Sequence, residues 1–328
     1  MSRLFRRRPL AGLAALAGLG LLAAGCSGGG GASAAPGGLE ETNLVVAAVP
    51  AMDSAGLYIA QQRGLFAAEG LHVTILPATS GATAITSQLK GKFAVTVGNY
   101  VSYIRQNAAN PKADQFRALA AGSIMQAGNQ EIMVTSNSKI HAVSQLAGKT
   151  IAVNVKENIG TLLVSSVLTD NAVQVPQPNQ FVPIPFPQMT NALAAGRVAA
   201  AWMPEPYVTE AEENIGAVPL ADSNQGHSQN MPISGYMVTA SWLKANPNTA
   251  AAFRKAIIEA QAIAATDPAA IEQGMHKFAG TPQTAAAIAN VPEYPTQQNT
   301  QLLQRLSNLM LNFGMLPQNY DVSQMIVK

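Results

Sequence analysis

The chain has 328 residues, of which 48% are hydrophobic and 12% are charged, and it carries 20 basic against 18 acidic residues. This length allows one large domain or two modest ones, and the low charge excludes a coiled coil and an extended disordered chain. Four of the basic residues, Arg3, Arg6, Arg7 and Arg8, lie at the start, which leaves 16 for the rest of the chain. A nucleic-acid-binding surface needs clustered lysine and arginine on the folded body, and the sequence shows no such cluster. We therefore expect no nucleic-acid partner.

Residues 1–25 have the features of a secretory signal peptide. The arginines give a positive start, and residues 10–24 form an apolar run of 15 residues. A bilayer-spanning helix needs roughly 20 such residues, so the run is short for a membrane anchor. Small residues then lead to Cys26, the only cysteine of the chain. This arrangement resembles the lipobox of bacterial lipoproteins, in which the cysteine thiol carries a diacylglycerol.

We therefore expect Cys26 to be the lipidated first residue of the mature protein. The alternative is an ordinary cleavage site followed by a small buried thiol. Residues 26–42 are rich in Gly, Ser, Ala and Pro, a composition typical of a flexible tether. Lipid, tether and soluble body together predict a protein held at the cell membrane on its extracytoplasmic face. The arginines do not distinguish Sec export from twin-arginine export.

A first series of elements runs from residue 43 to residue 135. Short apolar runs predict strands at residues 44–49, 71–76, 93–97, 116–121 and 131–135. Helices are predicted at residues 55–62, 80–90 and from Asn99 onward, with Asp53 and Ser54 as caps of the first. Strands that alternate with helices at this spacing indicate a parallel sheet covered on both faces.

The pattern then starts again. Helices are predicted at residues 143–146, 158–170 and 189–195, and strands at residues 150–153, 181–184, 198–202, 218–220 and 236–239. The remainder is mainly helical, with Ser241 and Asn248 as caps. The fold class is therefore α/β with two units, and we place the chain crossings near Ser136 and near Ser234. Lobe 1 then comprises residues 43–136 and 234–328, and lobe 2 comprises residues 137–233.

Five loops are candidates for a binding site. In open α/β sheets, ligands bind beyond the carboxyl ends of the strands, where helix N-termini offer free N–H groups. This rule selects residues 52–54, 79–81, 98–100, 154–158 and 202–207. None of these loops carries the residue set of an enzyme, and the four histidines have no metal-ligand spacing. We expect no catalytic residue, no metal and no cofactor.

Several segments carry a resemblance to a known family. They are residues 44–76, with Pro50, Asp53-Ser54-Ala55, Gly64-Leu65-Phe66 and Glu69-Gly70-Leu71, then Ser80-Gly81, Leu146-Ala147-Gly148-Lys149, Ala195-Gly196-Arg197-Val198 and Trp202-Met203-Pro204-Glu205-Pro206. The chain resembles the substrate-binding proteins of ABC importers in the nitrate/sulphonate/taurine and thiamine-pyrimidine-precursor group. The resemblance runs from about residue 43 to the end.

This resemblance implies the two-lobed periplasmic-binding-protein fold of the second type, with a ligand cleft between the lobes. The expected partners are a small-molecule solute and an ABC importer permease, and the protein is expected to be a monomer. Two alternatives stay open: an enzyme on the same scaffold that acts on a pyrimidine precursor, and a sensor lipoprotein. The family members that make thiamine pyrimidine carry a cysteine-rich motif, whereas this chain has a single cysteine.

The candidate ligand contacts come from the five loops and one strand end. They are Asp53, Ser54, Ser80, Gly81, Asn99, Gln126, Asn154, Asn158, Trp202, Glu205 and Tyr207. Each also has a structural interpretation: Asp53 as a helix cap, Ser80 and Gly81 as a helix start, Trp202 as core, and Glu205 as an acceptor for backbone N–H groups.

The charge of the loops favours one kind of ligand. Lys156 is their only basic side chain, against Asp53, Glu157 and Glu205. A sulphonate or nitrate calls for basic side chains or several helix N-termini. The composition therefore favours a neutral ligand rich in N–H groups, such as an aminopyrimidine, although helix ends alone are able to hold an anion.

Overall fold

The computed structural model describes residues 38–327, which contain two five-stranded sheets. The first sheet has the strand order β2-β1-β3-β10-β4. Its strands are β1 (Asn43–Ala48), β2 (His72–Pro77), β3 (Val95–Asn99), β4 (Phe116–Ile124) and β10 (Pro232–Thr239). The strand β1 is parallel to β2 and β3, whereas β10 is antiparallel to β3 and β4.

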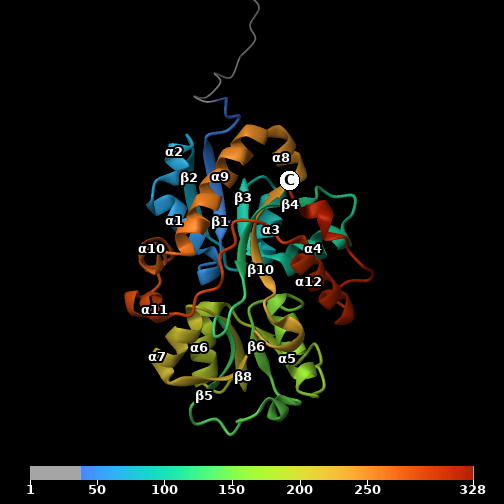
Figure 1. The fold of residues 1–328 in the computed structure, drawn as a ribbon. Coiled ribbons are helices and arrows are strands. Elements are labelled where there is room, and N and C mark those ends of the chain that lie inside the picture. The colour runs from blue at the N-terminus through green and yellow to red at the C-terminus, as the bar shows by residue number, and fades with distance from the viewer. Residues whose placement is uncertain (1–37, 328) are drawn as a thin grey trace, which may run out of the picture. The chain divides into compact units, whose positions relative to one another are not determined.

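The second sheet has the strand order β7-β6-β8-β5-β9. Its strands are β5 (Gln130–Thr135), β6 (Ile151–Val153), β7 (Phe181–Pro183), β8 (Ala200–Pro204) and β9 (Ala217–Asp222). The strand β6 is parallel to β7 and β8, whereas β5 is antiparallel to β8 and β9. Figure 1 shows the first sheet in the upper part of the view and the second sheet in the lower part.

The prediction of purely parallel sheets is wrong, because each sheet contains one strand that runs against its neighbours. These strands, β5 and β10, are the ones that follow the passages of the chain between the sheets. An apolar run has the same appearance in either direction, so the sequence pattern does not reveal this reversal.

The position of the first passage also differs from the expected crossing near Ser136. The strand β5 pairs with β8 and β9, so the chain leaves the first sheet within residues 125–129. It returns within residues 223–231, before β10 begins. The expected boundary came after this strand because its apolar run fits either sheet equally well.

Helices cover both sheets (Figure 1). With the first sheet lie η1 (Met52–Ser54), α1 (Ala55–Gln62), α2 (Leu65–Ala68), α3 (Gly81–Leu89), α4 (Tyr100–Ala109), α8 (Ala240–Ala245), α9 (Pro247–Ala264), α10 (Pro268–Gly274), η4 (Met275–Ala279), α11 (Gln283–Ile288), α12 (Thr300–Asn312) and η5 (Val322–Met325). With the second lie η2 (Val143–Leu146), α5 (Ile159–Asp170), α6 (Phe186–Ala194), α7 (Tyr207–Ile215) and η3 (Gly226–Ser228).

Two helix caps differ from the predicted ones. Thr239 caps α8 by accepting a hydrogen bond of 3.3 Å from the Trp242 N–H, so Ser241 lies inside this helix. Asn248 lies inside α9, because Pro247 occupies the first helical position and starts the helix before it. Proline suits that position, since its fixed φ is helical and its missing N–H would be unpaired there.

The apolar core forms two clusters, one of which spans both sheets. The first cluster joins α1, α2 and α9, and the ring of Phe66 on α2 stacks on that of Phe253 on α9 at 5.1 Å. The second runs from α4 and α12 into the second sheet and its helices. Within residues 38–327, no helix has both the length and the apolar character needed to cross a bilayer.

Candidate functional site

A small cavity of about 50 Å³ lies between the two sheets, at the ends of their strands. The first sheet and its helices contribute Asp53, Ser54, Gly81, Asn99 and Ser234 to the lining, and the second sheet and its helices contribute Gln130, Asn154, Ile159, Phe186 and Trp202. The structure thus brings together six of the predicted contacts: Asp53, Ser54, Gly81, Asn99, Asn154 and Trp202.

Asp53 lies in the first wall of the cavity, which the first sheet and its helices form. Its carboxylate accepts a hydrogen bond of 2.6 Å from the Ser123 hydroxyl, which is also 2.9 Å from the Ser234 hydroxyl. Ser234 donates in turn to the Asp53 carbonyl oxygen over 3.2 Å. Burial raises the pKa of Asp53 to about 6, and the Ser123 hydrogen bond opposes this rise. The carboxylate is therefore mainly ionised at neutral pH and is destabilised by its surroundings, so it favours a partner that donates hydrogen bonds.

Asp53 and Ser54 do not cap α1, contrary to the sequence prediction. No side chain accepts a bond from the first N–H groups of this helix. The Ser54 hydroxyl instead donates to the Val49 carbonyl oxygen over 3.0 Å. A 3-10 turn, η1, which contains both residues, comes directly before the helix.

The second wall presents polar atoms that have no partner within the described chain. These atoms are Nε2 and Oε1 of Gln130, Oδ1 of Asn154 and Nε1 of Trp202, and all are buried. Most buried polar groups in proteins are hydrogen-bonded, and an unpaired one costs stability. A cluster of four such atoms around one cavity points to a site that binds a polar molecule.

Aromatic rings complete this wall. The rings of Trp202 and Phe186 lie 5.9 Å apart with an interplanar angle of 52°, and Tyr207 stacks on Phe186 at 5.2 Å. Tyr207 therefore supports the wall from behind and does not line the cavity. Gly160 of α5 lies against Trp202, since a Cβ at this glycine would be 2.5 Å from the indole ring.

The remaining predicted contacts have structural roles. Ser80 caps α3 by accepting a bond of 3.3 Å from the Thr83 N–H. Asn158 caps α5 and accepts a bond of 3.1 Å from the Ser102 hydroxyl. Gln126 lies in the first passage between the sheets, with its Nε2 3.5 Å from the Glu293 carboxylate.

Glu205 does not line the cavity either. Its carboxylate accepts bonds from the Thr209 N–H at 3.1 Å, the Thr209 hydroxyl at 3.0 Å and the Asn290 N–H at 3.1 Å. Burial raises the pKa of Glu205 to about 7, while these hydrogen bonds lower it. Its carboxylate is engaged by the protein, as the structural interpretation of this residue requires.

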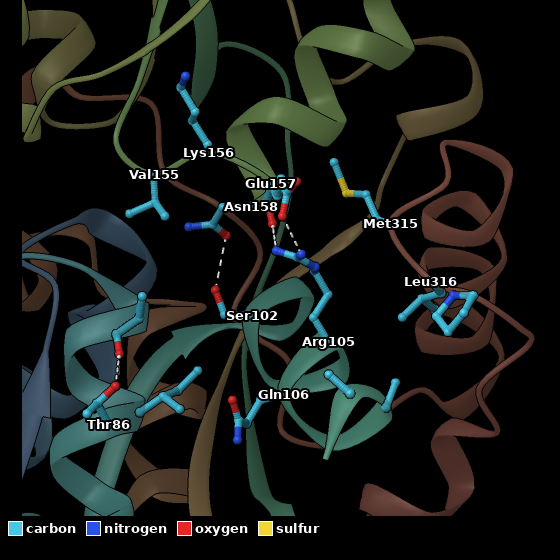
Figure 2. Close-up of a pocket in the computed structure, with 15 residues that line it drawn as sticks. Thr86, Ser102, Arg105, Gln106, Val155, Lys156, Glu157, Asn158, Met315 and Leu316 are labelled. Carbon is cyan, nitrogen blue, oxygen red and sulfur yellow. Dashed lines mark hydrogen bonds and ion pairs between the residues drawn. The ribbon is translucent and has the colours of Figure 1, made fainter. Parts of the chain in front are cut away.

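Contacts between the two sheet units flank the cavity. On one side the Met52 N–H donates to the Glu205 carbonyl oxygen over 3.0 Å. On the other side, Arg105 of α4 forms an ion pair of 2.5 Å with Glu157 (Figure 2). Figure 2 also shows Lys156 and the Ser102–Asn158 bond at a groove of about 450 Å³ beside this ion pair. The exposed Lys156 lies outside the cavity, whose described lining contains one charged side chain, that of Asp53.

Sequence reasoning missed Gln130, Phe186, Ser123 and Ser234. Ser123 lies beyond the predicted end of its strand, and Gln130 lies just before the predicted start of the next. Polar residues at the ends of buried strands were the available signal. Among residues 38–327, no group of three His, Cys, Asp or Glu side chains could hold a metal ion.

The fold and the cavity define a class of protein: two α/β units that enclose a small polar site where their strands end, as in periplasmic binding proteins. The alkanesulfonate-binding protein SsuA from Xanthomonas axonopodis pv. citri, bound to MOPS, is similar, with a TM-score of 0.73 at 17% identity over 88% of this chain and 98% of that chain. The desulfurization enzyme DSZB is similar with a TM-score of 0.62 at 17% identity, over 88% of this chain and 96% of that chain. These likenesses confirm the expected fold and do not by themselves decide between binding and catalysis.

Comparison of the sequence with known families assigns the chain to one of them. Residues 51–271 match the family described as NMT1/THI5 like, so the chain belongs to this family. A curated relative, YtlA of Bacillus subtilis (strain 168), whose name proposes a binding role, is 27% identical over 210 residues, which are 63% of this chain. The match spans 61% of the length of that relative.

Proposed function

We propose that this chain is an extracytoplasmic solute-binding protein, which captures a small organic solute in the cavity and delivers it to an ABC importer permease. The observation that carries the proposal is the set of unpartnered polar atoms on Gln130, Asn154 and Trp202, residues that line the same cavity as Asp53. The family and the names of its relatives support a binding role.

The cavity favours a neutral solute that donates hydrogen bonds over an anion. Among the described lining residues, Asp53 supplies the charge, and no lysine or arginine opposes it. A sulfonate or nitrate would meet this carboxylate with like charge. The N-termini of α3 and α4 offer N–H dipoles, and these are able to bind either class of solute.

Solute capture requires the two units to move as lobes. A cavity of about 50 Å³ is far below the roughly 300 Å³ of a typical small-molecule site. The lobes therefore separate to admit the solute and close on it, bending within residues 125–129 and 223–231. Closure of domains around a ligand by a few hinge residues is a common response of such an architecture.

The proposed location depends on Cys26, which lies outside the described residues. A lipid on this thiol would hold the body at the membrane surface through residues 27–42. Replacement by Cys26→Ser should release the protein into the soluble fraction. Unchanged retention in the membrane, or a mature N-terminus mapped elsewhere, would contradict the anchor.

Mass spectrometry of small molecules released from the purified full-length protein tests the binding function. We expect one solute in a near-stoichiometric amount, unchanged after incubation, and its re-addition should alter the fluorescence of Trp202. The Trp242→Phe variant isolates this signal, because the indole of Trp242 lies on α8 and donates to Glu41. Conversion of the solute to a product would instead support an enzyme on the same scaffold.

A further inference from the structure

Gln130 differs from the other buried glutamines in what its amide does. It is 1% exposed, and both amide atoms lack a partner among residues 38–327. Its backbone is held by β5, where its carbonyl oxygen accepts a bond of 2.9 Å from the Ser223 N–H. The sheet therefore fixes the backbone of Gln130, which lines the cavity, while its amide is unpaired among the described residues.

Gln88 provides the comparison. It is 3% exposed, and its Nε2 donates to the carbonyl oxygens of Ala94 at 3.1 Å and Met237 at 2.8 Å. Its Oε1 accepts a bond of 2.5 Å from the Thr96 hydroxyl. Both amide atoms of Gln88 form hydrogen bonds within the protein, whereas neither amide atom of Gln130 does so among the described residues.

We propose that Gln130 is the specificity-determining residue of the cavity, and that it binds a solute edge on which a hydrogen-bond donor and an acceptor stand side by side. The chemical class is an amide, a lactam or a neutral cyclic amidine. This inference rests on the proposed solute-binding function and adds to it the residue that selects the solute.

The amide group makes this pairing by its own chemistry. A glutamine offers one donating and one accepting atom in one plane, and it does so whichever way the amide is turned. An edge with one donor and one acceptor therefore forms two parallel hydrogen bonds with it. Trp202 Nε1 adds a donor and Asn154 Oδ1 adds an acceptor on the same wall.

An anion such as a sulfonate fits this wall poorly. It accepts hydrogen bonds and donates none, so among the unpaired side-chain groups of this wall it could use only the N–H groups of Gln130 and Trp202. The oxygens of Gln130 and Asn154 would then be left without donors, and the Asp53 carboxylate would keep only the bond from Ser123. A site discriminates strongly against a ligand whose binding leaves the buried polar groups of the site unpaired.

The test compares four probes on the full-length protein by calorimetric titration: 4-pyrimidinone with a lactam edge, 4-aminopyrimidine with an amidine edge, pyrimidine with acceptors alone, and ethanesulfonate. We expect the first two to bind more tightly than the last two. Gln130→Met keeps the shape of the side chain and removes both polar atoms. It should weaken binding of the first two probes by about 10-fold to 100-fold, the effect of two neutral hydrogen bonds.

The matched control is Gln88→Met. Because the Gln130 amide supports no described contact, Gln130→Met should leave the melting temperature unchanged or higher. Gln88→Met should lower the melting temperature, since Thr96 and two carbonyl groups lose their partner, and it should leave probe affinity unchanged in the folded protein. If Gln130 had a purely structural role, Gln130→Met would lower the melting temperature.

Gln130→Glu gives a second, independent result. It replaces the donor–acceptor pair by two acceptors, so it should weaken 4-pyrimidinone binding and favour acetamidinium, whose edge carries two donors. Unchanged affinity of the first two probes in both variants would overturn the role of Gln130. Ethanesulfonate binding that is tight and insensitive to Gln130→Met would overturn it while leaving the binding function intact. If none of the probes binds the wild-type protein, the role of Gln130 is overturned, and the mass spectrometry of released solutes decides the binding function separately.

Discussion

The N–H of Asn290 donates a hydrogen bond of 3.1 Å to the carboxylate of Glu205, which joins the segment after α11 to the start of α7. Glu205 belongs to the second sheet unit, whereas Asn290 follows helices that lie with the first sheet. The same carboxylate accepts two bonds from Thr209. The Glu205 side chain therefore links the two units and does not line the cavity.

We expect Glu205→Ala to lower stability and to leave solute affinity nearly unchanged in the folded protein. It leaves the buried Thr209 N–H and the partly buried Asn290 N–H without their acceptor, and a buried unpaired donor costs about 1–3 kcal/mol. Thermal melts at pH 8 measure the loss. The control is Glu212→Ala, at an exposed position on the same helix, which should change the melting temperature little. A large loss of solute affinity with unchanged stability would instead show that Glu205 contacts the solute.

Solute affinity should fall as the pH is lowered through about 6, the pKa to which burial raises Asp53. Protonation removes an acceptor that the solute uses, so affinity for 4-pyrimidinone should drop by about fivefold to tenfold between pH 7.5 and pH 5. This probe keeps its neutral form over that range.

Asp53→Asn should abolish the dependence, which separates it from the titration of Glu205. For an anionic solute the slope has the opposite sign, because protonation of Asp53 removes a like charge. Tighter binding at pH 5 would therefore identify an anion as the solute.

Glu131 should make the protein less stable as the pH rises from about 5 to about 8. Its Oε2 is buried without a partner among the described residues, and Asp222 is its direct neighbour on β9. Burial first, and then the charges of Asp222 and Glu205, raise its pKa to about 8 from 4.5. Between these values the folded state binds a proton that the unfolded state has lost, so the free energy of unfolding decreases with increasing pH.

Glu131→Gln should reduce this slope and raise the melting temperature at pH 8, and the remaining slope comes from Asp53 and Glu205, whose pKa values burial also raises. Denaturant titrations at pH 5 and pH 8 measure the effect. Glu259→Gln, at an exposed position of α9, serves as the control for the loss of a negative charge, because Glu259 is not among the charges that raise the pKa of Glu131. Equal stability of wild type and Glu131→Gln at pH 8 would show that the carboxyl is not destabilised in the folded protein.

The sequence predicted the fold class and the cavity residues that follow strand ends, such as Asp53 and Trp202. It did not predict that Glu205 turns away from the cavity, because a motif gives the position of a side chain and not its direction. It also missed Gln130, whose strand was assigned to the wrong sheet. Ladder partners far away in the sequence determine which sheet a short apolar strand joins, and β5 pairs with strands roughly 70 to 90 residues later.

Gly160→Ala should damage the cavity through Trp202. A Cβ at Gly160 would lie 2.5 Å from the indole ring of Trp202, which is 1% exposed, so the ring or the helix must shift. Overpacking of this kind costs about 1–3 kcal/mol, although alanine favours a helix by about 0.5–1 kcal/mol over glycine. We expect lower stability, an altered Trp202 fluorescence spectrum and weaker solute binding together.

The control is Gly274→Ala in α10, where the nearest atom, Cβ of Tyr58, lies 3.4 Å from the new Cβ at an ordinary contact distance. That variant should be neutral or slightly stabilising and should bind as the wild type does. Since Gly274 lies away from the cavity, a Gly160→Ala protein that behaves like Gly274→Ala would show that the Trp202 position does not control the site.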